Sequence, residues 1–122
     1  MHSAAKAYGN VARQTASGRD LEADLLLKAA SRLQAIHDAW DNKKSELADA
    51  LLYNRKLWSI FMNDVTGPDH ALPVEVRQNV ANLGMFVMNQ TLSITADPKP
   101  DHLGSLININ RQLAAGLRGQ PS

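Results

Sequence analysis

The sequence predicts an all-α protein, a single-domain helical bundle of four main helices with a short helix at the N-terminus. In four successive stretches, apolar residues recur at the three- and four-residue spacing of an amphipathic helix. No stretch shows the alternation of apolar and polar residues that is typical of a half-buried strand. The breaks between stretches are short, so neighbouring long helices are expected to pack antiparallel. The 122 residues fit one domain over 1–122.

Residues 1–19 carry basic residues but no acid, and they contain a short helical pattern with Tyr8, Val11 and Ala12 on one side. The small residues at 16–18 are expected to end this helix, since glycine interrupts regular structure. Two interpretations of residues 1–18 stay open. They form either a loosely docked N-terminal helix or an arm that becomes ordered on a partner.

The first long helix is expected over residues 20–40, with acids in its first turn, where the helix dipole favours them. A second is expected over 43–65, and Gly67 followed by Pro68 ends it. This second helix is the predicted centre of the core, because aromatic side chains bury more apolar area than others. Its apolar face carries Leu47, Leu51, Asn54, Trp58, Phe61 and Val65.

Pro73 is expected to open the third long helix, which runs to about Ala96. This helix is apolar over more of its circumference than a single core stripe requires. A rigid break at 97–100 separates it from the last helix, which is expected to reach about Leu117. Residues 119–122 are expected to form a frayed tail.

Amide side chains on apolar faces predict a buried hydrogen-bond network. A buried amide that lacks a partner costs about 1–3 kcal/mol, so each of these residues requires one. The favoured interpretation is a structural polar network that fixes helix register. An alternative is a polar anchor that faces a partner. The predicted network consists of Asn54, Arg55, Asn79, Asn110 and Arg111.

Composition and spacing exclude several classes of site. The formal net charge is +1, which gives no bulk argument for binding nucleic acid or an anionic membrane. Cysteine is absent, no histidine pair has the spacing of a helical metal site, and no nucleophile or phosphate-binding motif occurs. No apolar run is long enough to span a bilayer. We therefore expect a protein that is not an enzyme and has no metal or cofactor.

Flexible and aromatic apolar side chains gather around the second and third long helices. The default interpretation is ordinary core. The alternative is an adaptable groove for a partner helix, because methionine repacks readily around different ligands. The predicted partner-binding residues are Phe61, Met62, Met85, Phe86 and Met88.

The order and spacing of several motifs resemble the FlaF family of flagellar biosynthesis regulators. The resemblance covers nearly the whole chain, and the motifs are specific together rather than singly. They are Ala4-Ala5-Lys6-Ala7-Tyr8, Arg19-Asp20-Leu21-Glu22 with Leu25-Leu26, Asn54-Arg55 with Trp58, Leu72-Pro73 with Arg77 and Asn79, and Leu106-Ile107 with Ile109-Asn110-Arg111.

The resemblance implies a small cytoplasmic protein that flagellin production and export require. It implies a flagellin-binding chaperone that works with FlbT, a regulator of flagellin translation. Flagellin termini are amphipathic segments that must be kept from polymerising before export. The alternative is a post-transcriptional regulator of flagellin mRNA, acting directly or through FlbT. Direct RNA binding is disfavoured, because basic residues are dispersed and the aromatic residues lie on core stripes.

Overall fold

A computed structural model describes the backbone of residues 4–66 and 73–119 and the side chains of residues 19–65 and 73–119. Within these residues every regular element is helical, which confirms the all-α prediction. The elements are α1 (Ala4–Asp38), α2 (Trp40–Lys43), the 3-10 turn η1 (Lys44–Glu46), α3 (Leu47–Thr66), α4 (Val74–Ala96), the 3-10 turn η2 (Pro100–His102) and α5 (Gly104–Leu117).

Four long helices form the bundle, as predicted, but the short N-terminal helix is not separate. It is the first part of α1, which continues through Gly18 without a break. A glycine inside a helix lowers its stability but does not have to end it. Just after the C-terminal end of α5, Gly119 has a φ of 69°, and its N–H donates to the Gly116 carbonyl at 3.0 Å. The predicted stop at 67–69 and the tail at 120–122 lie outside the described residues.

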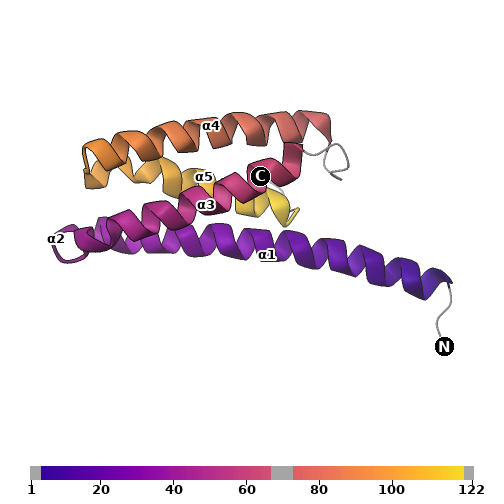
Figure 1. Ribbon diagram of the computed structural model, residues 1–122. Helices are drawn as coiled ribbons and strands as arrows, with labels where there is room; N and C mark the ends of the chain where they lie inside the picture. Colours follow the sequence, from indigo (N-terminus) through magenta and orange to yellow (C-terminus); the bar gives the residue numbers. More distant parts are fainter. Residues whose placement is uncertain (1–3, 67–72, 120–122) are drawn as a thin grey trace.

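Three of the four neighbouring helix pairs pack closely: α1 with α5, α3 with α4, and α1 with α3. In Figure 1, α1 and α4 lie on opposite sides of the molecule, with α3 and α5 between them. In the fourth pair, α4 and α5, the two backbones come close to each other at only a few positions. The backbones of α4 and α5 therefore lie farther apart than those of the other three pairs, although Gln90 on α4 donates to the His102 carbonyl just before α5 at 3.3 Å.

The core is centred on α3, as the sequence predicts. Trp58 is fully buried, and Phe61 packs edge to face against it with ring centroids 6.2 Å apart. Each long helix contributes an apolar stripe to this core. Its largest fully buried apolar side chains are Trp58, Leu26, Leu33, Ile94, Leu103, Leu106, Val65, Val80 and Val87.

Candidate functional site

A buried hydrogen-bond network crosses the centre of the bundle. The indole Nε1–H of Trp58 donates to Asn110 Oδ1 at 2.9 Å. The Asn110 amide nitrogen donates to Asn54 Oδ1 at 2.7 Å and to the Leu26 carbonyl at 3.3 Å. Asn54 and Asn110 are both fully buried. One amide thus joins α1, α3 and α5.

The chemistry of indole fixes the orientation of both amides. Because an indole nitrogen only donates, Asn110 must present its oxygen to Trp58 and its nitrogen to Asn54. Asn54 then accepts through its oxygen, and its own Nδ2 has no hydrogen-bond partner. Asn110 therefore supports three groups, whereas Asn54 supports one and carries an unsatisfied donor.

The network is smaller than the sequence predicts. Arg55, Asn79 and Arg111 are exposed on the outer surfaces of their helices, so they are not part of this buried cluster. Helical geometry explains the two arginines, since a residue next to a core position points about 100° away from it. Asn79 lies on the wall of a surface groove instead.

The structure does not bring the five predicted partner-binding side chains into one groove. Phe61 is buried, and Met88 is partly buried against the core. Met62 occupies the space beside Gly84, where a Cβ would collide with the Met62 thioether. These three side chains therefore pack within the bundle. Only Met85 and Phe86 are exposed, by 61% and 46%.

An apolar groove does exist between α4 and α5. Its volume is about 210 Å³. Among the residues that the structure describes, none of those lining the groove is charged, and each wall presents one amide, from Asn79 on α4 and Gln112 on α5. The groove, called the α4–α5 groove below, is lined by Val76, Asn79, Val80, Leu83, Ile109, Gln112, Leu113 and Gly116.

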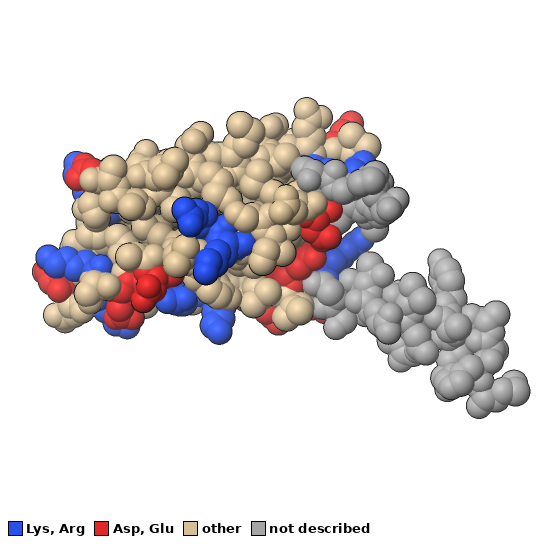
Figure 2. Space-filling model, viewed as in Figure 1, with Lys and Arg blue, Asp and Glu red and all other residues tan. Residues whose placement is uncertain are grey.

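The exposed surface of α4 extends this uncharged character. From Gln78 to Ala96 the helix contains no charged residue. In Figure 2 the upper surface, where α4 lies in Figure 1, is uncharged between its two ends, while charged side chains gather lower on the molecule. Exposed apolar surface of this kind marks a site of association more often than a solvated face. The exposed apolar side chains of α4 are Val74, Val76, Leu83, Met85, Phe86 and Leu92.

Sequence reasoning missed the α5 wall of the groove. Sequence patterns alone give Ile109, Leu113 and Gly116 no binding role. The available signal is the glycine in the last turn of an amphipathic helix. The groove itself gives no sequence signal, since its width depends on how far α4 lies from α5.

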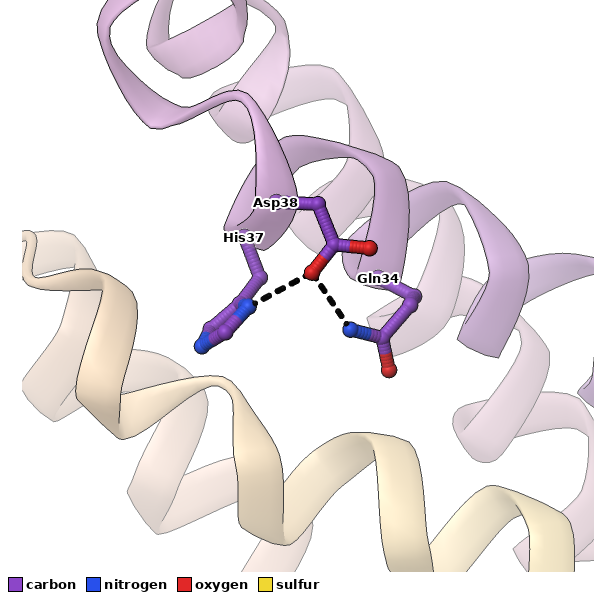
Figure 3. Close-up of polar contacts among 3 residues, drawn as sticks. All are labelled: Gln34, His37 and Asp38. Carbon is purple, nitrogen blue, oxygen red and sulfur yellow. Dashed lines mark hydrogen bonds and ion pairs between the residues drawn. The ribbon is translucent and has the colours of Figure 1, made fainter.

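Two carboxyl groups outside the groove, among the described residues, have shifted pKa values. Burial raises the pKa of Glu22, and the Asp64 charge raises it further, while Arg19 opposes the shift. At the end of α1, Asp38 Oδ1 contacts His37 Nδ1 at 3.0 Å and accepts from Gln34 Nε2 at 2.9 Å (Figure 3). The hydrogen bond with His37 is the main cause that lowers the pKa of Asp38, and the bond from Gln34 lowers it further. Both groups belong to local surface arrangements on or beside α1.

The described residues contain no group of three His, Cys, Asp or Glu side chains arranged to hold a metal ion. None of the described helices combines the length and the apolar character needed to cross a membrane. Two larger surface pockets also exist: one of about 370 Å³ whose lining includes Lys44, and one of about 460 Å³ whose lining includes Phe61, Glu22 and Asp64. The α4–α5 groove differs from both because no charged residue among the described ones lines it.

The family comparison places this helical bundle among flagellar proteins. Residues 4–117 match the family described as flagellar protein FlaF, and the chain belongs to that family. The match spans all four long helices, so it includes the network and both walls of the groove. No curated protein and no solved structure matches the chain.

Proposed function

We propose that this protein is a flagellin-binding export chaperone and regulator. It holds an amphipathic terminal segment of flagellin before secretion and so couples flagellin synthesis to flagellum assembly. Its place of action is the cytoplasm, it works together with FlbT, and it acts by binding rather than by catalysis. Membership of a flagellar family supports the flagellar role. The binding role rests on the α4–α5 groove.

The α4–α5 groove is the observation that carries this proposal. An amphipathic helix binds by laying its apolar face into a hydrophobic groove, with anchors at helical spacing. The α4–α5 groove offers such a floor through Val80, Leu83 and Leu113. A helix docked there would pack against α4 and α5 together. Phe86, one turn beyond Leu83 on α4, would extend the contact.

The chaperone proposal and the mRNA alternative differ in their response to salt. Binding through apolar anchors survives added salt, whereas binding through phosphates weakens steeply between roughly 50 and 200 mM salt. The experiment titrates a flagellin terminal peptide and flagellin leader RNA at both concentrations. Salt-resistant peptide binding supports the chaperone. Salt-sensitive RNA binding without peptide binding supports the regulator and contradicts the proposal.

Two aspartate variants with a matched control place the binding on the groove. Leu83→Asp puts a charge on the groove wall, and Phe86→Asp puts one on the adjoining surface of α4. Leu52→Asp is the control, because Leu52 on α3 is 39% exposed, close to the 37% of Leu83, but does not line the groove. Peptide affinity should fall in both α4 variants and hold in the control. Equal losses in all three would point to general destabilisation and remove the groove from the proposal.

A further inference from the structure

No side chain among the described residues packs against the position that a Cβ of Gly116 would occupy. Gly116 lies in the last turn of α5 and lines the α4–α5 groove. A Cβ built at Gly116 has no heavy atom within 4 Å, so alanine would fit without any movement. Glycine lowers helix stability relative to alanine because its backbone loses more freedom on folding. The open space beside Gly116 is therefore available to another molecule.

The lining of the groove restricts what that molecule can be. In the described part of the chain, no Asp, Glu, Lys, Arg or His lines it. A charge brought into an apolar groove without a partner loses its hydration and gains no ion pair. The two wall amides, Asn79 and Gln112, offer both donors and acceptors to neutral polar groups. Complementarity thus favours an uncharged docking face.

The residues that line the groove form one row on each of its two helices. On α4 the lining residues are Val76, Val80 and Leu83, and on α5 they are Ile109, Leu113 and Gly116, each set separated by three or four positions. Such rows form the ridges between which the side chains of a third helix pack. A glycine in one row lets the third helix approach more closely at that point.

We propose that the α4–α5 groove binds one amphipathic helix of a partner protein, whose docking face has apolar anchors, amide or hydroxyl flanks and no charge. Its backbone packs against Gly116, and its neutral flanks hydrogen-bond to Asn79 and Gln112. The inference rests on the proposed function, since it specifies the class of segment that the same groove takes. The dependence of binding on Gly116 distinguishes this docking mode from a general apolar contact.

The first test uses two glycine substitutions that should separate stability from binding. Gly116→Ala should raise the melting temperature by about 1–5 °C, because alanine favours the helix. The same variant should bind a flagellin terminal peptide about tenfold more weakly, because its methyl group holds the partner backbone away. Gly104→Ala is the control, since its Cβ also meets nothing within 4 Å and Gly104 does not line the groove. It should leave affinity unchanged.

The second test uses designed helices as probes. One carries leucine and alanine on its docking face with glutamine and serine flanks, and two matched peptides place a single lysine or glutamate on that face. The neutral probe should bind. The affinity of each charged probe should be lower by about tenfold or more, because a charge that loses its hydration in the groove gains no ion-pair partner. Equal affinity for all three would overturn the inference.

The outcomes separate this inference from the proposed function. If the neutral probe binds in a Gly116-dependent manner and flagellin peptides do not bind, the inference stands and the flagellin proposal fails. If flagellin peptides bind wild type and Gly116→Ala equally, the flagellin proposal stands and the inference is overturned. Sedimentation tests whether a second copy of this chain occupies the groove instead. A wild-type dimer that Gly116→Phe converts to a monomer would assign the groove to that second copy and overturn the inference.

Discussion

Replacing Asn110 by leucine tests the central network most directly. Leucine has the same number and branching of side-chain heavy atoms as asparagine but cannot form hydrogen bonds. The substitution leaves two buried groups without partners: the Trp58 indole N–H loses its acceptor, and Asn54 Oδ1 loses its donor. Each loss costs about 1–3 kcal/mol, so the free energy of unfolding should fall by about 2–6 kcal/mol.

The partner substitution should behave differently. Asn54→Leu removes an acceptor from Asn110, which keeps the Leu26 carbonyl, and it also removes the unsatisfied Nδ2 donor. It should therefore cost less than Asn110→Leu. In the double variant the amide that Asn110→Leu orphans is gone, so about 1–3 kcal/mol should be recovered relative to Asn110→Leu alone. The double variant is thus expected to be more stable than one of its parents.

Urea unfolding followed by far-ultraviolet circular dichroism measures these differences. A protein of this size has a slope of about 1–3 kcal/mol per molar urea, so the midpoint for Asn110→Leu should fall by about 1 M or more. Asn108→Leu, an exposed change on the same helix, is the control and should stay near wild type. Equal costs for the two buried asparagines, or simple additivity in the double variant, would refute this reasoning.

Three further predictions concern packing and charge. Trp58→Ala removes the centre of the core and should cost about 3–5 kcal/mol, enough to unfold or nearly unfold the protein; a melting temperature unchanged within a degree or two would contradict this. Gly84→Ala forces the Met62 side chain to move and should lower stability by about 1–3 kcal/mol, as measured by thermal melting, and an increase would show that Met62 is not confined there. Because the pKa of Glu22 is raised in the folded state, its protonated form stabilises the fold, and this contribution is lost as pH rises through the folded pKa. Glu22→Gln should therefore be more stable than wild type at pH 7, and unfolding curves should show that advantage shrinking as pH falls toward 4.5, the ordinary pKa; a constant difference would rule the linkage out.

The helices and the core could be predicted from the sequence because both depend on local periodicity. On α3, the residues of the stripe that includes Asn54 and Trp58 recur every three or four positions, and this spacing alone places both side chains on the core face. The continuity of α1 through Gly18 could not be predicted in this way. Turn signals suggest a break there, whereas a helix that is already formed extends through one glycine at modest cost.

The candidate site was harder to predict because it depends on distances between helices. Phe61 and Phe86 are both phenylalanines in apolar stretches, yet Phe61 is buried on the core stripe of α3 and Phe86 is exposed on α4. The groove requires α4 to stand apart from α5, and no spacing within either helix contains that information. Asn79 shows the same limit, since its polar role changes from core to groove wall with the position of its helix.

The close packing of α1 against α5 has a consequence for the newly made chain. The first and last helices of the described fold are partners, and the bond between Asn110 and the Leu26 carbonyl joins residues 84 positions apart. Contacts between distant parts of a chain must wait for the loop between them to close, which slows folding. On the ribosome, α1 and α3 therefore emerge before the amide that satisfies Trp58 has been synthesised. Until α5 arrives, the apolar faces of these helices remain available to other proteins, including any that meet the chain during its synthesis.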